Sequence, residues 1–174
     1  MSQRQFTFGR EKIEDTHDEV EALVRDYFAR TKASEDTPPL EFNWHSYVVM
    51  ERQGMIVLGT VRQNTTKLVG FVFYIVAPHP HHCSIITAHC DMIAVNPDFR
   101  GMGLGTLLVE HGVRLLKCIG VSMVIHGYRH TYDADTTPLF SRLGFRAIET
   151  MYRKDIGQRV EEERTSLRKW GWIT

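Results

Sequence analysis

The sequence predicts one mixed α/β domain in which helices flank a central β-sheet. Apolar residues recur at helical spacing in 16–30 and 104–120, and they form shorter, strand-like runs elsewhere. The strand-like runs in the middle of the chain are 55–62, 68–76 and 84–95. With 174 residues, the chain can bury a core of its own without disulfides or metal ions. We therefore expect a single domain over 1–174, with 155–174 as a C-terminal extension.

The first part of the chain is expected to form a short strand and two helices. Residues 5–9 are strand-like, and Thr16 and Glu19 have the spacing of a capping box at the start of the helix 16–30. Two prolines in the stretch SEDTPPLEF end this helix in a surface loop. A second, shorter helix should follow over 43–54.

The centre of the chain is expected to form a β-hairpin and a third long strand. The polar turn QNTTK separates 55–62 from 68–76, and the second of these runs is apolar on both faces, which is typical of a strand inside a sheet. The turn APHPHH leads into the strand 84–95. The histidines of this turn and the following Cys83 are too crowded for a tetrahedral metal site, so we expect a solvated turn and no metal.

The last part of the chain continues the alternation of helices and strands. After a glycine-rich junction we expect the helix 104–120, the strand 121–128, a short helix over 136–143 and a closing strand over 145–156. Gly120 stands where a glycine commonly ends a helix. The buried side of the helix 104–120 should carry Leu104, Leu107, Leu108, Leu115 and Ile119.

Composition and charge argue against several classes of protein. The 21 basic and 21 acidic side chains cancel, so no global charge draws the chain to nucleic acid or to an anionic membrane. The longest apolar run, LVGFVFYIVAP, has about half of the roughly 20 residues that a membrane-spanning helix needs. The N-terminal stretch MSQRQFTFGREK contains no apolar signal segment, and the three cysteines show no paired spacing. We expect a reduced, cytoplasmic protein without membrane or nucleic-acid partners.

The stretch DFRGMGLG, residues 98–105, places three glycines between a predicted strand and a predicted helix. Helix N-termini bind phosphate through free N–H groups, and Gly101, Gly103 and Gly105 would let a phosphate approach the backbone. The stretch lacks the lysine of a P-loop, and its GxGxG pattern differs from the GxGxxG of dinucleotide-binding proteins. A tight turn with a glycine-rich helix start would also explain the glycines, so these residues alone leave both interpretations open.

The context of these glycines is more specific. The segment IAVNPDFRGMGLGTLLVEHG resembles the acetyl-CoA-binding motif of the GNAT superfamily of acyl-CoA N-acyltransferases. In that motif a strand leads to an Arg or Gln, a Gly and a further Gly or Ala, matched here by Arg100, Gly103 and Gly105. The segment LFSRLGF also resembles a family pattern, and the resemblance is specific over 89–154. It implies a GNAT-like domain with a mixed, helix-flanked sheet whose strands at 89–95 and 121–128 splay apart.

The resemblance also implies where acetyl-CoA, the expected co-substrate, binds. Its pantetheine arm would pair with the main chain of the strand near Ile93, Ala94 and Val95. Its pyrophosphate would rest on the N–H groups of Arg100, Gly101, Met102, Gly103, Leu104, Gly105 and Thr106. Phe140, in the position of a family tyrosine, is placed beside the cofactor as well.

Acyl transfer to an amine needs a base that takes a proton from the amine, directly or through water. Strand alternation would put His89, Asp91, Ile93 and Val95 on one face and Cys90 on the other. His89 and Asp91 occupy strand positions where family members often carry such a base, and histidine titrates near neutrality. Either residue, or both acting through water, could take the proton. Each could also be a hydrogen-bonded polar residue at the rim of the sheet.

The short helix departs from the family pattern. Many family members carry a tyrosine there as the general acid for the departing thiolate, whereas this chain has Phe140. The general acid could be Tyr132 or His130. The reaction could also proceed without a general acid, because a thiolate is a tolerable leaving group. A third possibility is that catalysis has been lost. His126, beside the expected wedge, could contact the substrate or simply pack in the sheet.

The leading hypothesis is an N-acetyltransferase that moves an acetyl group from acetyl-CoA to a primary amine by direct attack in a ternary complex. The amine could belong to a small molecule or to a protein, as a lysine or an N-terminus. The amine pocket is expected to consist of residues 30–45, the loop 128–136 and the start of the strand 89–95. Acidic residues in the first two segments favour a cationic amine: Glu35, Asp36, Glu41, Asp133 and Asp135. The alternatives are a non-catalytic acyl-CoA-binding or interaction protein, and a nucleic-acid- or metal-binding protein with a fortuitous glycine turn. The tail with Trp170 and Trp172 could pack on the core or on a second copy, so a homodimer stays open.

Overall fold

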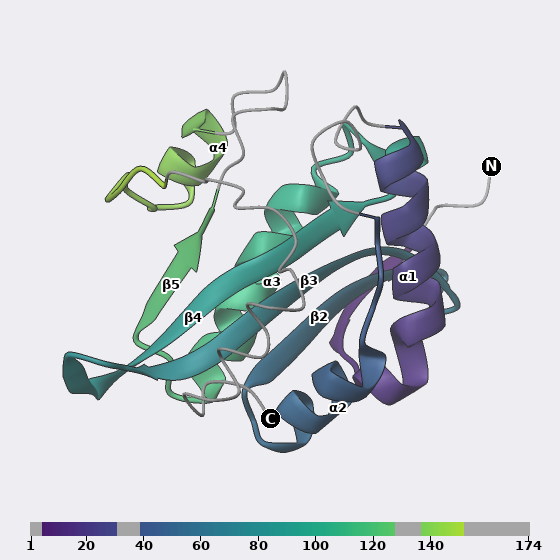
Figure 1. The fold of residues 1–174 in the computed structure, drawn as a ribbon. Helices are drawn as coiled ribbons and strands as arrows, with labels where there is room; N and C mark the ends of the chain where they lie inside the picture. Colours follow the sequence, from purple (N-terminus) through teal and green to yellow (C-terminus); the bar gives the residue numbers. More distant parts are fainter. Residues whose placement is uncertain (1–4, 31–38, 128–136, 152–174) are drawn as a thin grey trace. The chain divides into compact units, whose positions relative to one another are not determined.

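The computed structural model of the chain describes residues 5–30, 39–127 and 137–151. The chain forms two compact units, residues 1–144 and residues 145–174. All helices and strands of the described residues lie in the first unit (Figure 1). In the second unit, the described residues 145–151 form neither a helix nor a strand.

A five-stranded sheet forms the centre of the first unit within the described residues. Its strands, which lie side by side in chain order, are β1 (Phe6–Arg10), β2 (Ile56–Gln63), β3 (Lys67–His79), β4 (His82–Val95) and β5 (Met123–His126). Neighbours from β1 to β4 run antiparallel, whereas β4 and β5 run parallel. The sheet is therefore mixed, as the family resemblance implies.

Helices cover both faces of this sheet. Within the described residues they are α1 (Ile13–Arg30), α2 (Trp44–Arg52), α3 (Leu104–Cys118) and α4 (Thr137–Arg142). α1 and α2 pack on one face, while α3 packs on the opposite face (Figure 1). A short 3-10 helix, Pro97–Phe99, joins β4 to α3. None of the helices in the described ranges combines the length and the apolar character needed to cross a membrane.

The sheet carries a separate apolar core on each face. Under α3, the buried side chains include Val57, Val61, Val72, Tyr74, Leu108 and Leu116. Under α1 and α2, they include Ile13, Val20, Val24, Leu58, Phe71 and Phe73. β3 contributes to both cores, because its successive residues point to opposite faces and most of them are buried. The apolar run 68–76 is thus a strand inside the sheet, as predicted.

α1 starts earlier than the sequence predicts. It begins at Ile13, whose N–H donates to Glu51 Oε2 of α2 at 2.9 Å. Thr16 is buried inside the helix, where its hydroxyl donates to the carbonyl of Lys12 at 2.8 Å. The predicted capping box is therefore wrong. A carboxylate from another helix caps α1 instead, and a contact of that kind has no local sequence signal.

The buried stripe of α3 also differs from the predicted one. Leu107 is 43% exposed, and Ile119, just beyond the helix, is 40% exposed. The buried residues of α3 are Leu104, Leu108, Val109, Gly112 and Leu116. Gly112 belongs to this stripe because Tyr74 packs there, and a Cβ at Gly112 would lie 2.6 Å from Tyr74 Cε2. The predicted burial of Leu104 and Leu108 is confirmed, and Leu115 packs against the core. The prediction is wrong for Leu107 and Ile119, and it omits Gly112 because a search for apolar side chains passes over glycine.

The predicted closing strand 145–156 does not form in the described residues 145–151. Their apolar side chains are largely exposed, with Ile148 at 60% and Met151 at 83%. Strand-forming residues become a strand only where a neighbouring strand pairs with them, and residues 145–151 have no such pairing. Residues 152–156 lie outside the described residues.

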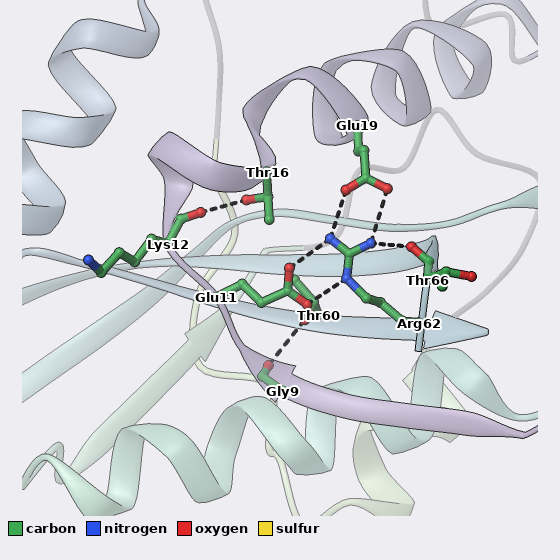
Figure 2. A network of polar contacts seen from close by, with 8 residues as sticks. All are labelled: Gly9, Glu11, Lys12, Thr16, Glu19, Thr60, Arg62 and Thr66. Carbon is green, nitrogen blue, oxygen red and sulfur yellow. Dashed lines mark hydrogen bonds and ion pairs between the residues drawn. The ribbon is translucent and has the colours of Figure 1, made fainter. Parts of the chain in front are cut away.

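Arg62, on β2, links neighbouring elements at one edge of the sheet (Figure 2). Its Nη2 lies 2.8 Å from Glu11 Oε2, between β1 and α1, and 2.7 Å from Glu19 Oε2, on α1. The hydrogen bond from Arg62 lowers the pKa of Glu19. Burial raises the pKa of Glu11, but the hydrogen bonds from Arg62 and Thr60 outweigh it and the net pKa is lowered. The network thus fixes the start of α1 over β2.

Candidate active site

β4 and β5 lie side by side for only part of their length. Their parallel pairing ends at Cys90 of β4 and His126 of β5. β4 continues to Val95, and within the described residues no strand pairs with 91–95 on the β5 side. Figure 1 shows the β5 arrow ending while β4 continues. Among the residues that the structure describes, this edge of the β4 main chain has no strand partner beyond Cys90, in agreement with the predicted splayed strand pair.

A β-bulge lies at the point of divergence. In the pairing of β4 with β3, Cys90 lies opposite Tyr74 and Met92 lies opposite Phe73. Asp91 is therefore an extra residue on β4 that has no counterpart on β3. Such an extra residue shifts the two-residue period of a strand by one position.

The bulge separates residues that the sequence predicts to share a face. Cys90, before the bulge, packs into the core under α3, and so do Ile93 and Val95 after it. His89 therefore points to the face of α1 and α2, where Asp91 contacts α2. The prediction of one common face for His89, Asp91 and these two later residues is wrong, because the bulge reverses the alternation. The predicted opposite directions of His89 and Cys90 are confirmed.

Asp91 is held by a residue that the sequence analysis does not single out. The hydroxyl of Tyr47, on α2, donates to Asp91 Oδ2 at 3.2 Å. The ring of Tyr47 packs against Trp44 and Phe73, with centroid distances of 5.5 and 5.6 Å. Burial, with a contribution from the charge of Asp91, raises the pKa of Tyr47 to about 12. This hydroxyl therefore remains a hydrogen-bond donor at neutral pH.

His89 and Asp91, the two predicted proton acceptors, lie on the same face of β4. His89 is exposed, and in the described part of the chain neither a hydrogen bond nor an ion pair joins it to Asp91. A proton relay between these two side chains would therefore need an intervening water molecule.

The loop between β4 and α3 is shaped by two left-handed glycines. Gly101 has a φ of +76° and Gly103 has a φ of +74°, a region that favours glycine. Phe99 anchors the loop in the core and is 6% exposed. α3 begins at Leu104, and the N–H groups of its first turn lack acceptors inside the helix. The predicted junction of strand, glycine loop and helix start is thus present.

Gly105 differs from the two glycines before it. Its φ is not positive, and a Cβ there would meet nothing within 4 Å. Neither the backbone nor the packing therefore requires glycine at this position. The same open space lies around Gly101 and Gly103. The first turn of α3 presents its N–H groups and a partial positive charge at an open surface, which a phosphate could approach.

Two contacts tie the loop to the end of α1. The guanidinium of Arg100 lies over the ring of Tyr27, 5.8 Å from the ring centroid. Arg30 Nη1 lies 3.6 Å from Asp98 Oδ1. The family resemblance implies that Arg100 binds a phosphate of the coenzyme. Its side chain is exposed, and the contact with Tyr27 keeps the guanidinium beside the glycine loop.

A partly buried polar pair lies where the pairing of β4 and β5 ends, on the α3 side of the sheet. The hydroxyl of Tyr74 and Nε2 of His126 are 3.0 Å apart, and the ring of Phe140 packs on His126 at a centroid distance of 5.1 Å. Burial lowers the pKa of His126 to about 4, so its imidazole is neutral at pH 7. Burial also raises the pKa of Cys90 to about 12, so its thiol stays protonated. These groups offer hydrogen bonds but no charge.

Several residues singled out from the sequence lie outside the described residues: His130, Tyr132, Glu35, Asp36, Asp133, Asp135, Trp170, Trp172 and the tail 155–174. Their roles stay predictions. Across 5–30, 39–127 and 137–151, no three His, Cys, Asp or Glu side chains gather as metal ligands would. The three cysteines, Cys83, Cys90 and Cys118, are free thiols.

A mixed sheet with a splayed strand pair, followed by a glycine loop and an open helix start, is the architecture of acyl-CoA-dependent acyltransferases. A family model described as the acetyltransferase (GNAT) family matches residues 17–145. The chain belongs to this family, and it is an acetyltransferase. The family normally uses acetyl-CoA as co-substrate, and an acetyltransferase of this kind has an amine as acceptor.

Individual relatives agree with this assignment. A glucosamine 6-phosphate N-acetyltransferase from Trypanosoma brucei brucei is 27% identical over 105 residues, which cover 60% of this chain and 69% of that protein. The crystal structure of a Trypanosoma brucei acetyltransferase has a TM-score of 0.64 at 25% identity, covering 87% of this chain and 100% of the other. The glucosamine-6-phosphate N-acetyltransferase from Arabidopsis thaliana shares the fold, with a TM-score of 0.67 at 15% identity over 88% of this chain and 99% of the other.

Proposed function

We propose that the protein transfers the acetyl group of acetyl-CoA to a primary amine by direct attack in a ternary complex. The observation that carries this proposal is the open edge of β4, which leads through the glycine loop to the N-terminus of α3. Amide groups of the pantetheine arm would pair with the main chain of Ile93, Ala94 and Val95. The pyrophosphate would rest between Arg100 and Thr106, where glycines leave space and the helix supplies a partial positive charge.

The acceptor amine would bind on the face of α1 and α2, beside His89 and Asp91. Its nitrogen must lose a proton as it attacks the thioester carbon, and either side chain can take that proton, directly or through water. The amine adds to the thioester carbon and forms the C–N bond, which gives a tetrahedral oxyanion. Its collapse restores the C=O bond and breaks the C–S bond, and the proton that the amine gives up balances the one that the CoA thiolate takes up. A main-chain N–H of β4 beyond Cys90, where no described strand pairs with it, would stabilise the developing oxyanion.

Protonation of the thiolate does not depend on the residue at position 140. Phe140 has no proton to donate, and it lies against the neutral imidazole of His126, which also contacts the Tyr74 hydroxyl. Tyr132, outside the described residues, stays a candidate for the general acid. A thiolate is also a tolerable leaving group, so solvent can protonate it after the C–S bond breaks.

The acceptor class is the least determined part of the proposal. Two relatives carry the name glucosamine 6-phosphate N-acetyltransferase, and an aminoglycoside acetyltransferase from a soil metagenome, crystallised with sisomicin, shares the fold at 15% identity with a TM-score of 0.66. The carboxylates of Asp91 and of the exposed Glu41 favour an acceptor that carries positive charge. An acceptor panel should therefore contain glucosamine 6-phosphate, an aminoglycoside, a polyamine and a lysine peptide.

Calorimetric titration with acetyl-CoA of the wild type and of Gly105→Glu tests the proposal. Gly105 has no positive φ and has open space around it, so glutamate fits and is favourable in the first turn of a helix. Its carboxylate would occupy the expected phosphate position. We expect micromolar binding by the wild type and a loss of at least about 100-fold, or about 2.7 kcal/mol, in the variant. Gly105→Ala, which the family motif allows, is the matched control and should bind.

The titration and an assay of the amine panel together test the two parts of the proposal, coenzyme binding and acetyl transfer. Absence of binding by the wild type would overturn the coenzyme site and the proposed reaction together. Binding without turnover of any amine in the panel would leave the coenzyme site standing and would exclude these amines as acceptors.

A further inference from the structure

We infer that Tyr47 is a positioning residue that fixes Asp91 as the proton acceptor on the amine side of the site. This inference rests on the proposed acetyl transfer and gives α2 a role in it. The contact that carries it joins the Tyr47 hydroxyl to Asp91 Oδ2 over 3.2 Å.

The geometry of β4 favours Asp91 over His89 as the proton acceptor. His89 lies within the paired part of β4, opposite Ile75 of β3 and Ile125 of β5. Asp91 is the first residue beyond that pairing, where the two strands separate. The bulge leaves it without a counterpart on β3 and directs its exposed side chain to α2. Of the two candidates, Asp91 therefore lies at the opening between the strands.

The donor of this hydrogen bond is itself held in place. The ring of Tyr47 packs on Phe73 in the core and on Trp44. Trp44 donates from Nε1 to Glu21 Oε2 of α1 at 2.6 Å and stacks on Phe42 at a centroid distance of 4.7 Å. Tyr47 is thus fixed relative to both the sheet and α1, so its hydroxyl defines one position for the Asp91 carboxylate.

The hydrogen bond leaves the reactive part of the carboxylate available. Tyr47 engages Oδ2, and among the described residues the Asp91 side chain forms no second hydrogen bond and no ion pair. Oδ1 can therefore accept a proton from the amine or from a bridging water. A side chain on a bulge has several rotamers within reach, and a fixed donor selects the one that presents Oδ1 to the substrate.

Steady-state kinetics of the full chain, with acetyl-CoA and the best amine of the panel, tests this role. Tyr47→Phe keeps the packed ring and removes only the hydroxyl, so we expect kcat to fall about tenfold with an unchanged KM for acetyl-CoA. Asp91→Asn should lower kcat by about 100-fold or more. The double variant should be no slower than Asp91→Asn alone, because Tyr47 acts through Asp91. Val49→Ala, at an exposed position of α2, is the control and should match the wild type.

A second variant tests the same role in case Tyr47→Phe impairs folding. Asp91→Glu keeps the charge but displaces the carboxylate from the Tyr47 hydroxyl, and it should lower kcat to an extent similar to Tyr47→Phe. A wild-type kcat in both Tyr47→Phe and Asp91→Glu would overturn the inference. So would a double variant of Tyr47→Phe and Asp91→Asn in which the two losses of kcat multiply. Either result would leave the proposed function standing. A wild type that binds no acetyl-CoA or acetylates no amine would overturn the proposed function and this inference with it.

Discussion

At the scale of single residues, His126 couples the stability of the sheet to pH. Burial lowers the pKa of its imidazole to about 4, whereas a histidine in an unfolded chain titrates near 6.5. Between these values the unfolded chain binds more protons than the native protein, so the free energy of unfolding decreases as the pH falls. The decrease should begin near pH 6.5, end near pH 4 and amount to about 3 kcal/mol from this residue alone.

Urea unfolding of the wild type and of His126→Gln at several pH values between 7 and 4 measures this effect. Glutamine keeps a polar partner for the Tyr74 hydroxyl but does not titrate, so the variant should lose less stability over the same interval. Carboxylates contribute equally to both proteins, and the difference between the two curves isolates His126. Parallel curves would contradict the assignment of a neutral, buried imidazole.

Single residues also show which contacts a sequence can predict. The cluster at Gly101 and Gly103 predicts a special backbone conformation, and both residues adopt a positive φ. The contact between Tyr47 and Asp91 has no such signal in the sequence, because 44 positions separate the two residues and neither lies in a motif that predicts its partner. Backbone constraints are local and can be predicted, whereas the partner of a polar side chain depends on how distant elements pack.

At the scale of elements, the Arg62 network should contribute measurably to the position of α1 (Figure 2). Arg62 is only 16% exposed and contacts both Glu11 and Glu19. Arg62→Leu would leave two neighbouring carboxylates without their common partner, so we expect a loss of about 2–3 kcal/mol in the free energy of unfolding. Arg62→Lys should retain only part of this free energy. A lysine keeps the positive charge, but an ammonium cannot bind two carboxylates in the forked geometry of a guanidinium.

Denaturant unfolding of these variants, with Arg52→Ala as control, provides the measurement. Arg52 forms an ion pair with Glu14 at 2.9 Å but is 70% exposed, and its removal should change stability by less than about 1 kcal/mol. A loss in Arg62→Leu no larger than that of Arg52→Ala would mean that the network adds nothing beyond an ordinary surface ion pair.

The range of β4 can be predicted from the sequence, but the irregularity within it cannot. Its existence follows from the apolar run, and the predicted range 84–95 lies within the observed His82–Val95. The bulge at Asp91 does not follow, because neither a glycine nor a proline marks it, and it exists only in the pairing with β3. One such residue reverses the expected direction of every later side chain of the strand, so the faces of Ile93 and Val95 cannot be predicted from the sequence alone.

At the scale of the whole molecule, the mixed sheet follows from the order of its elements, but the open edge of β4 depends on where pairing ends. β5 has four residues, Met123–His126, where the sequence predicts a strand over 121–128. The shorter strand leaves 91–95 of β4 unpaired on that side within the described residues. The proposed cofactor site is thus a property of the assembled sheet rather than of the glycine motif alone.

Binding of acetyl-CoA should therefore stabilise the unit formed by residues 1–144, since every described residue of the candidate site lies in it. A ligand present at about 100 times its Kd adds about 2.7 kcal/mol to the free energy of unfolding. For a chain of 174 residues this corresponds to an increase in Tm of roughly 5–10 °C. Scanning calorimetry should find this increase in the wild type and not in Gly105→Glu. An equal increase in both proteins would place the ligand away from α3, and a wild type whose Tm does not move would argue against a coenzyme site in this unit.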